Sequence, residues 1–303
     1  MKNTNEMYKV NLHILEPCNY RCKHCFAHFD STKITSVEHW MNIVDNCMAT
    51  GKVYEFNIAG GEPLMYKDLD KLIKHIKASG ARCSIITNGS LMTSEWIRKN
   101  AAYFDTIGFS IDSFVPGTMV SMGRCDNKGR FLSAERFMSI CNEIRDVNFD
   151  ACVKVNTVVT ATNKDEVPAE IIKRISPSIN KWKLLRMSVF KTDCFDNSEY
   201  QISTEEYYRF VSSNLACLGK TLDNVYIDAG RVITESGINV VIENTLTNTY
   251  IMIDSSGYLV DNSSHSKYKQ VIDCQKEDFK KGLEILNFNQ ELYFARYNTQ
   301  LVC

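Results

Sequence analysis

Three cysteines near the amino terminus are the residues best suited to chemistry. Cys18, Cys22 and Cys25 have the spacing Cys-x-x-x-Cys-x-x-Cys and follow an apolar, strand-like run. Three thiolates on one short loop can bind three irons of a 4Fe–4S cluster and leave the fourth iron open to a substrate or cofactor. We therefore expect a 4Fe–4S cluster with these three cysteines as its metal ligands.

Two other interpretations of this loop stay open. Zinc also binds cysteine and histidine, and His24 and His28 lie close by. Structural zinc sites usually pair two short hooks, however, and the chain has no second Cys-x-x-Cys. The three thiols could also bind no metal. The nine other cysteines have no metal-ligand spacing, so we expect most of them to be small buried hydrophobic residues.

A glycine pair marks a second candidate site. Gly60 and Gly61 precede Glu62 in Gly-Gly-Glu-Pro, at the end of a predicted strand. Glycines let the backbone approach a ligand closely, and the Glu62 carboxylate could bind a cationic amine. An ordinary strand-to-helix turn would use the same residues.

Short polar side chains follow the next two predicted strands. Asn88 lies in Thr-Asn-Gly-Ser, and Ser110 and Asp112 lie in Ser-Ile-Asp-Ser. These side chains suit hydrogen bonds to a ribose or a carboxylate, although Asx-type turns favour the same residue types.

Cations occur within otherwise apolar strands. Lys154 and Asn156 share one face of a predicted strand, Lys183 lies in the next strand, and Arg124 lies in a loop. A lysine inside such a strand is costly unless it is paired or hydrated. If these cations meet in one pocket, they suit a triphosphate with a charge of about −4 through charge-assisted hydrogen bonds. Alternatively, the lysines reach solvent at the strand ends.

The elements that must position these residues alternate over the first 200 residues. Strands are predicted at 10–15, 53–58, 83–87, 106–111, 153–160 and from 182, and helices at 36–50, 69–76, 94–101, 133–146 and 165–175. Such alternation builds a parallel sheet with helices outside. Six units are fewer than the eight of a closed barrel. We therefore predict an α/β fold, a partial (β/α)6 TIM-like barrel, with ligand sites at the carboxyl ends of the strands.

The pattern changes after residue 200. A helix at 204–217, strand-like runs at 249–253 and 258–260 around a turn, and a final helix at 277–287 are expected. We therefore expect two parts, with residues 1–200 as the barrel and residues 201–303 as a C-terminal α+β extension that caps the active site.

The composition is typical of a soluble globular protein, with 44% hydrophobic and 23% charged residues and a net charge of −1. Without a basic surplus, we expect no general attraction to nucleic acid or to acidic membranes. No signal peptide precedes the first strand, and no apolar run reaches the ~18 residues of a membrane span. A cytoplasmic protein with no nucleic-acid or membrane partner is therefore expected.

The motifs, taken in order, resemble a known family. The cysteine loop resembles the signature of the radical S-adenosylmethionine enzymes. From about residue 10 to residue 267, the chain is similar to viperin and its prokaryotic relatives. This likeness depends on Asn-Gly-Ser-Leu at 88–91, Asp-Ser-Phe at 112–114, Gly-Arg at 123–124, Lys-Val-Asn at 154–156 and Trp-Lys at 182–183.

The resemblance implies a radical S-adenosylmethionine nucleotide dehydratase. The reduced cluster would cleave S-adenosylmethionine, and the 5′-deoxyadenosyl radical would remove the ribose 4′ hydrogen of a nucleoside triphosphate. Loss of the 3′-hydroxyl as water would give a 3′-deoxy-3′,4′-didehydro nucleotide. CTP is the favoured substrate, with UTP or GTP as alternatives. An electron donor such as flavodoxin or ferredoxin and a role in antiviral defence are also implied.

The family's site residues can be assigned to matching positions of this chain. The cofactor would contact Gly60, Gly61, Glu62, Asn88, Ser110, Asp112 and Asn156. The triphosphate would contact Asn11, Arg124, Lys154, Lys183 and Lys267. Tyr250 and Lys154 would be catalytic, because Tyr250 matches a tyrosine near the reacting ribose that could supply hydrogen or a proton.

The chain also departs from the family. Glu55 replaces a common lysine, Lys181 an arginine and Cys125 a glycine, and we expect no counterpart of the amphipathic N-terminal helix of animal viperin. Glu243 precedes the strand of Tyr250. A carboxylate there could accept a hydrogen bond from the cytosine amino group, whereas uracil presents an acceptor, and this favours CTP.

Two other functions stay open. One is a radical enzyme that modifies peptides or a molybdopterin-type cofactor, but such enzymes usually carry further C-terminal cysteines for auxiliary clusters. The other is an iron–sulfur or zinc sensor that binds nucleotides without catalysis.

Overall fold

The structure, a computed structural model, describes residues 7–27, 34–220, 229–233, 238–244, 249–264, 268–286 and 288–298. Its strands are β1 Tyr8–His13, β2 Val53–Ala59, β3 Arg82–Thr87, β4 Thr106–Ser110, β5 Cys152–Val159, β6 Lys181–Arg186, β7 Ala229–Ile233, β8 Asn239–Glu243, β9 Ile251–Ile253, β10 Tyr258–Asp261 and β11 Lys269–Asp273. Its α-helices are α1 Val37–Ala49, α2 Leu69–Ala78, α3 Ser94–Asn100, α4 Pro116–Ser121, α5 Ala134–Val147, α6 Ala169–Arg174, α7 Thr204–Cys217, α8 Phe279–Ile285 and α9 Gln290–Asn298.

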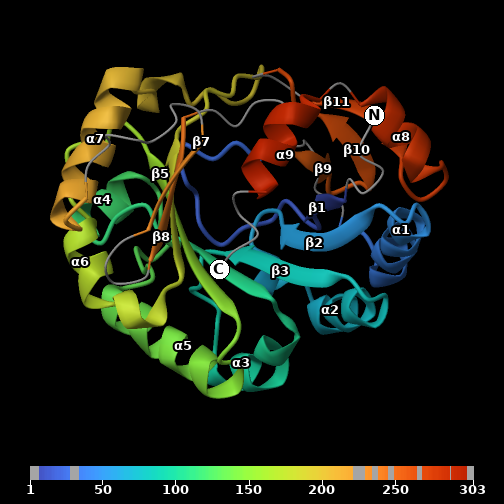
Figure 1. Cartoon of the computed structure of the whole chain (residues 1–303), viewed down its shortest axis with the longest axis horizontal. Helices are drawn as coiled ribbons and strands as arrows, with labels where there is room; N and C mark the ends of the chain where they lie inside the picture. Colours follow the sequence, from blue (N-terminus) through green and yellow to red (C-terminus); the bar gives the residue numbers. More distant parts are fainter. Residues whose placement is uncertain are drawn as a thin grey trace.

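All described strands belong to one sheet, in the order β11-β10-β9-β1-β2-β3-β4-β5-β6-β8-β7. Strands β1 to β6 are parallel neighbours in chain order, as predicted. Helices lie around the outside of the curved sheet (Figure 1). The predicted partial barrel is therefore confirmed, and the edge strands β7 and β11 do not pair with each other in the described part of the chain.

Strands that follow residue 200 lengthen this sheet at both edges. Strand β8 pairs with β6 and β9 pairs with β1, both in parallel, whereas β7, β10 and β11 add antiparallel strands. The predicted hairpin corresponds to β9 and β10. Strands β7, β8 and β11 and helices α4 and α9 were not predicted.

Hydroxyl side chains define the starts of several helices. Ser36, Thr93 and Ser133 each accept a hydrogen bond from a backbone N–H in the first turn of α1, α3 and α5. Ser203 and Glu206 form a reciprocal capping box at α7, which is why its predicted bounds agree with the structure.

Helix α6 begins at Ala169 and not at 165, which corrects the predicted start. Pro168 disfavours helical backbone at the preceding residue. The segment before it is held as a turn, because the Asn163 side chain donates to the carbonyl oxygens of Asp112 and Val158 at 2.7 and 3.0 Å.

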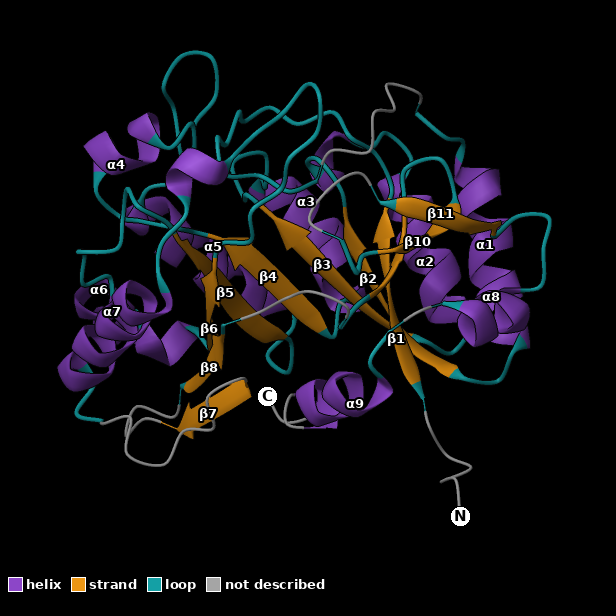
Figure 2. Cartoon of the chain, turned by 90° about the horizontal axis from the view of Figure 1, so that it is seen from above, coloured by secondary structure: helices purple, strands orange, loops and turns teal. Residues whose placement is uncertain are grey.

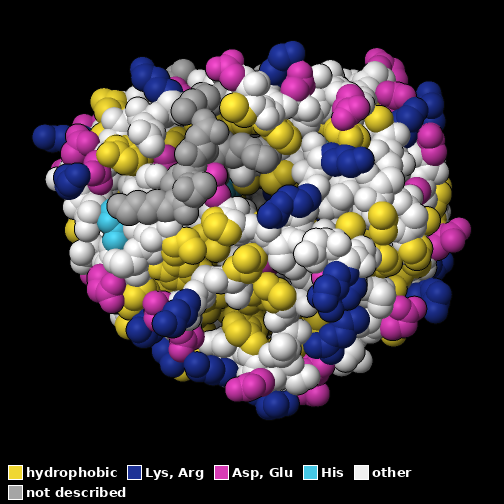
Figure 3. Space-filling model, turned by 180° about the vertical axis from the view of Figure 1, so that it is seen from behind, with side chains coloured by type: hydrophobic (Ala, Val, Ile, Leu, Met, Phe, Trp, Pro, Cys, Tyr) yellow, Lys and Arg dark blue, Asp and Glu magenta, His cyan; other side chains and the backbone are white. Residues whose placement is uncertain are grey.

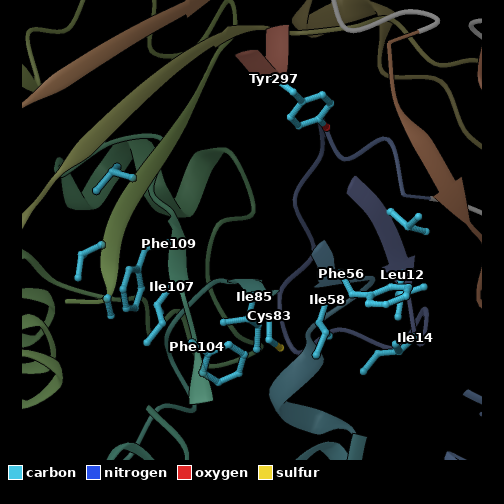
Figure 4. Close-up of a cluster of buried hydrophobic side chains, with 14 of the residues drawn as sticks. Leu12, Ile14, Phe56, Ile58, Cys83, Ile85, Phe104, Ile107, Phe109 and Tyr297 are labelled. Carbon is cyan, nitrogen blue, oxygen red and sulfur yellow. The ribbon is translucent and has the colours of Figure 1, made fainter. Parts of the chain in front are cut away.

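The core lies between the sheet and the outer helices. Alternate residues of each strand face the helices, and they include Leu12, Phe56, Ile85, Ile107 and Phe109, all almost fully buried (Figure 4). The other residues of the same strands face the inside of the barrel, because side chains alternate along a strand. This inner face carries the polar residues of the candidate site.

The two ends of the barrel differ. Strand β1 starts near the N-terminus, where helix α9 also lies, and the loops that follow the parallel strands gather on the opposite side (Figure 2). The cysteine loop, which follows β1, belongs to the latter side. No helix among the described residues has both the length and the apolar character needed to cross a membrane.

Candidate active site

The start of the cysteine loop is attached to the glycine pair by backbone contacts. Gly61 N–H donates to the carbonyl of Leu15 at 2.7 Å, and Glu62 N–H donates to the carbonyl of Pro17 at 3.0 Å. A Cβ atom on Gly61 would lie 2.1 Å from the backbone oxygen of Glu16. The close approach for which these glycines are needed is therefore to the chain's own backbone, and it fixes the entry to the cysteine loop.

The middle of the cysteine loop is attached to a second glycine segment. Arg21 N–H donates to the carbonyl of Gly123 at 3.1 Å, and Lys23 N–H donates to the carbonyl of Met122 at 3.0 Å. Gly123 has a φ of 68°, and a Cβ there would lie 2.0 Å from the Arg21 carbonyl oxygen. The loop that carries the three cysteines is thus held on both sides by glycine contacts.

The thiols themselves lie in a partly buried setting. Burial raises the pKa of Cys18 and Cys22 and raises the pKa of Cys25 to about 12, so without a metal they are protonated at neutral pH. Asn88 Nδ2 lies 4.0 Å from Cys18 Sγ, and Arg124 Nη1 lies 3.2 Å from Cys22 Sγ. Donors of this kind stabilise thiolates that ligate a metal centre.

The arrangement of the thiols fits an iron–sulfur cluster. Within the described residues, no three His, Cys, Asp or Glu side chains are grouped as ligands of one metal ion. Thiolates of a cluster bind different irons, so they need not meet around one point, whereas zinc requires its ligands around a single ion. His28 lies outside the described residues. The set of three cysteines, with Arg124 beside Cys22, is suited to a cluster.

Glu62 is buried beside this loop, with 1% of its surface exposed. Its carboxylate accepts hydrogen bonds from Thr87 Oγ1 at 2.6 Å, from Asn88 N–H at 2.8 Å and from Leu64 N–H at 3.1 Å. Burial nevertheless raises the pKa of Glu62. A cationic partner would stabilise the charged form of a carboxylate that is buried in this way.

Asn88 joins the end of β3 to the cysteine loop. Its Oδ1 accepts from Ser90 N–H at 2.9 Å, which is the Asx turn considered as an alternative. Its Nδ2 donates to Asn19 Oδ1 at 2.9 Å, next to Cys18. Ser110 ends β4 and is the register partner of Asn156 on β5.

Asp112 is a fully buried anchor and not a free acceptor. Its Oδ2 lies 2.6 Å from Arg124 Nη2 and 3.1 Å from His24 Nε2, and its Oδ1 accepts from Val158 N–H at 2.8 Å. Burial alone would raise the pKa of Asp112, but Arg124 and then His24 outweigh burial and hold that pKa below its usual value. Asp112 thus fixes Arg124 against Cys22.

A cluster of lysines lies on the inner face of the barrel. Lys154 on β5 is the register partner of Lys181 on β6, and Asn156 is the partner of Lys183. The side-chain ammonium of Lys154 makes no hydrogen bond or ion pair with another described residue. Burial, followed by repulsion from Lys9, Lys183 and Lys181, lowers its pKa well below the ordinary value. Such a cluster is suited to a polyanion.

Two carboxylates accompany these lysines. Lys183 Nζ lies 2.5 Å from Glu243 Oε1, and both side chains are less than 10% exposed. Lys9 Nζ lies 2.5 Å from Glu55 Oε1. Reasoning from sequence missed Lys9, although its position two residues before Asn11 places both side chains on the inner face of β1.

Amide side chains extend the polar face. Asn11 Nδ2 donates to the carbonyl of Ile251 at 3.0 Å, and Asn57 Nδ2 donates to Asn11 Oδ1 at 2.9 Å. The buried Oδ1 of Asn156 has no hydrogen-bond partner among the described residues. Tyr250 directly precedes β9, next to Ile251, whereas Lys267 lies outside the described residues.

Arg124 and the lysines therefore occupy different places. Arg124 contacts Cys22 and Asp112, whereas Lys154, Lys181 and Lys183 form their own cluster on β5 and β6.

Viewed from the side that carries the loops after the parallel strands, the surface is hollowed near its centre, and lysine or arginine side chains border the hollow (Figure 3).

Comparison with known proteins agrees with this geometry. Residues 14–175 match the model of the Radical SAM superfamily. An S-adenosylmethionine-dependent nucleotide dehydratase from Selenomonas ruminantium is 35% identical over 96% of this chain and 98% of its own length. A protein of the same name from a Fibrobacter strain is 31% identical over 95% of this chain and 87% of its own length.

Solved structures confirm the fold. The crystal structure of Streptococcus suis SuiB bound to precursor peptide SuiA aligns with a TM-score of 0.67 at 13% identity, over 95% of this chain and 66% of that chain. At this identity the likeness concerns the fold alone. The family match and the relatives that align over almost the whole chain show that the protein belongs to the radical SAM superfamily and, within it, to the viperin-like S-adenosylmethionine-dependent nucleotide dehydratases, a family of enzymes.

Proposed function

We propose that this enzyme dehydrates a nucleoside triphosphate, with CTP as the first candidate and UTP and GTP as alternatives. The observation that carries the proposal is the buried lysine cluster around Lys154, which lies inside the same barrel whose strand ends carry the three cysteines. A peptide substrate would not require a concentration of buried cations, whereas a triphosphate would.

Cys18, Cys22 and Cys25 would hold one 4Fe–4S cluster, with S-adenosylmethionine beside it. Glu62 suits the amino group of the cofactor, and Arg124 suits its carboxylate, because the charges of both side chains act on Cys18 from its surroundings. When bound, these groups supply a carbon radical that can remove a hydrogen atom from a ribose.

The remaining cofactor contacts follow from the positions of the polar residues. Asn88 and Ser110 end adjacent parallel strands, and Asn156 offers a buried acceptor, so these three residues suit the hydroxyl groups of the cofactor's ribose. Gly60 and Gly61 contribute by fixing the cysteine loop. Asp112 acts through Arg124, which it orients.

The substrate's triphosphate would bind Lys154, Lys181, Lys183 and Asn11, and the resemblance adds Lys267. The resemblance also assigned Arg124 to the triphosphate, but because Arg124 contacts Cys22 and Asp112 we propose the cofactor's carboxylate as its partner instead. Binding through several charged groups sets the ribose at a fixed place relative to the cysteine loop. Lys154 can hold a proton at Nζ for the 3′-hydroxyl that leaves as water, because a bound triphosphate favours its charged form. Tyr250 is proposed as the second source of hydrogen or a proton.

The sequence suggested that Glu243 selects the nucleobase, but its position favours another explanation of nucleobase selection. Glu243 pairs with Lys183 at 2.5 Å, so if Lys183 binds phosphate then Glu243 lies beside the phosphates and not beside the base. CTP therefore stays the first candidate through the family resemblance. Turnover of CTP, UTP and GTP by the wild type and by Glu243→Gln tests this. A change of preference in the variant would restore Glu243 as the base-reading residue.

Further parts of the proposal have other grounds. The resemblance supplies a flavodoxin- or ferredoxin-type electron donor and a role in antiviral defence. Composition and the change of pattern after residue 200 supply a cytoplasmic setting without nucleic-acid or membrane partners, and residues 201–303 as a C-terminal extension that caps the active site.

Anaerobic reconstitution with iron and sulfide, followed by mass spectrometry with each nucleotide, tests the proposed reaction. We expect 5′-deoxyadenosine formation to rise when one nucleoside triphosphate is added, together with a nucleotide product lighter by one water. A reduced, cluster-loaded protein that forms no such product from any nucleoside triphosphate would refute the proposal. About eight irons per chain would instead favour a peptide- or cofactor-modifying enzyme with auxiliary clusters.

A further inference from the structure

Lys9, near the start of β1, is a cation that points into the barrel. Its Nζ lies 2.5 Å from Glu55 Oε1, and the two side chains are 13% and 8% exposed. Glu55 is itself fixed, because its Oε1 accepts from Ser84 Oγ at 2.7 Å. Since Lys9 and Glu55 are register partners on β1 and β2, the ammonium is held on the inner face of the sheet.

The backbone of Lys9 is fixed as well. Its N–H donates to the hydroxyl of Tyr293 at 2.7 Å, and the same hydroxyl donates to the Lys9 carbonyl at 3.1 Å. Tyr293 belongs to α9 and is fully buried. With the main chain and the ammonium both held, Lys9 loses little further conformational freedom if a ligand binds it.

Lys154 extends toward the same region from the other side. A Cβ on Gly108 of β4 would lie 3.0 Å from Lys154 Cε, so the lysine stem passes over β4, which separates β5 from β3. Gly108 is the register partner of Lys154 and leaves the room for this stem. Lys154 is thereby directed across the barrel toward the side of β1 and β2. Among the neighbouring cations, Lys9 exerts the largest repulsion on Lys154.

One lysine of this group lies outside the ion pairs of the described residues. Lys9 pairs with Glu55 and Lys183 pairs with Glu243, whereas the Lys154 ammonium forms no ion pair with a described residue. A buried ammonium without a counter-charge is costly, and a polyanion relieves that cost.

We propose that Lys9 is a further polyphosphate-binding residue of the nucleotide pocket, held in place by Glu55. The inference rests on the proposed function and extends it. Glu55 neutralises Lys9, whose charge acts on Lys154. When a polyphosphate binds, the ammonium of Lys9, which has three N–H donors, is shared between Glu55 and a phosphate oxygen.

Calorimetric binding of inorganic tripolyphosphate and of CTP tests this assignment without any catalytic readout. For Lys9→Met we expect affinity for tripolyphosphate to fall about tenfold or more, since a charge-assisted contact is lost. The loss should grow from CMP to CDP to CTP, whereas S-adenosylmethionine affinity stays unchanged. Lys9→Arg should retain most of the affinity. Lys77→Met, which removes the partner of Asp105 outside the barrel, is the matched control.

If the Lys9–Glu55 ion pair only stabilises the fold, its removal should leave the affinity for tripolyphosphate unchanged. If Lys9→Met alone fails to fold because Glu55 is left unpaired, the double variant Lys9→Met/Glu55→Gln removes both charges and keeps the packing. Weak tripolyphosphate binding by the folded double variant supports the assignment. Affinity equal to that of the wild type overturns it.

The outcomes for Lys9 and for the proposed function are distinguishable. A wild type that binds tripolyphosphate through Lys9 but forms no nucleotide product contradicts the function and leaves the assignment of Lys9 standing. A wild type that converts CTP, with unchanged binding in the Lys9 variants, contradicts Lys9 and leaves the function standing.

Discussion

Single residues on the inner face of the barrel carry charges that the fold alone does not need. Lys154 makes no ion pair with a described residue, and the lysines around it lower its pKa further than burial would alone. Glu62 is buried with a raised pKa. Groups in such settings are found where ligands bind, because the ligand supplies the missing counter-charge.

Lys154→Met should weaken nucleoside triphosphate binding by about 1–3 kcal/mol, the range for a hydrogen bond to a charged group. It should also raise the melting temperature of the nucleotide-free protein. The pKa of Lys154 is lower in the folded protein than in the unfolded chain, so the unfolded chain binds the lysine's proton more strongly. This difference destabilises the folded protein at neutral pH, and the destabilisation disappears as the pH rises toward the ordinary pKa of lysine. Calorimetry and thermal unfolding measure both effects. Lys67→Met, an exposed lysine, serves as the control, and a Lys154 variant with lower stability would contradict the account.

His13 should make the protein sensitive to mild acid. Burial lowers its pKa from the ordinary 6.5 to about 4. Between these pH values the unfolded chain binds a proton that the folded chain does not, so stability falls as pH falls, by about 3 kcal/mol in total. Unfolding followed from pH 7 to pH 4 should show a smaller loss for His13→Gln than for the wild type. Equal slopes would rule out His13 as the source.

At the level of elements, the cysteine loop is held by two glycine segments that follow β2 and α4. Both segments use backbone contacts closer than any side chain allows. This geometry explains why glycines occur at the ends of elements remote from the cysteines in sequence. It also means that the cluster site depends on residues that need not touch the cluster.

Gly61→Ala should therefore lower iron binding. Its Cβ would lie 2.1 Å from one backbone oxygen and 2.2 Å from another, so the cysteine loop must move. We expect the reconstituted variant to hold less iron per chain and to have a weaker cluster absorbance. Gly117→Ala is the matched control, because a Cβ there meets nothing within 4 Å. Full iron content in the Gly61 variant would refute this dependence.

For the whole molecule, segments from the two ends of the chain complete one sheet. Strands β8 and β9, which follow residue 200, are neighbours of β6 and β1, and α9 joins β1 through Tyr293. The rings of Tyr8, Phe288, Phe294 and Tyr297 surround the Tyr293 ring. The C-terminal helix thus stabilises the strand that leads into the cysteine loop.

Tyr293→Phe should destabilise the protein by about 1–3 kcal/mol, because the N–H of Lys9 loses its hydrogen-bond acceptor in a buried place. Denaturant unfolding measures this change. Tyr258→Phe is a suitable control, since the Tyr258 hydroxyl makes no hydrogen bond to a described residue. Equal stability of the two variants would show that the helix is held by its rings alone.

The sequence predicted the fold better than it predicted which side chains contact each other inside the barrel. Strands β1 to β6 follow from runs of apolar residues, and the helix expected at 204–217 has the bounds of α7. Strand β8 was missed because only Val240, Val241 and Ile242 are apolar, and a run of three does not distinguish a strand from a loop. Helix α9 was missed because its aromatic residues Tyr293 and Phe294 pack on Tyr8 of β1, which is far away in the chain.

The sequence by itself determined the cysteine loop, the alternation that builds the barrel and the family, because these depend on residues close together in the chain. Only the tertiary structure decided which charges meet. Arg124 faces Cys22, Lys183 faces Glu243 and Lys9 faces Glu55, and each of these contacts joins separate segments. Side-chain alternation says which face a residue occupies, but strand order and register set its neighbours across the barrel.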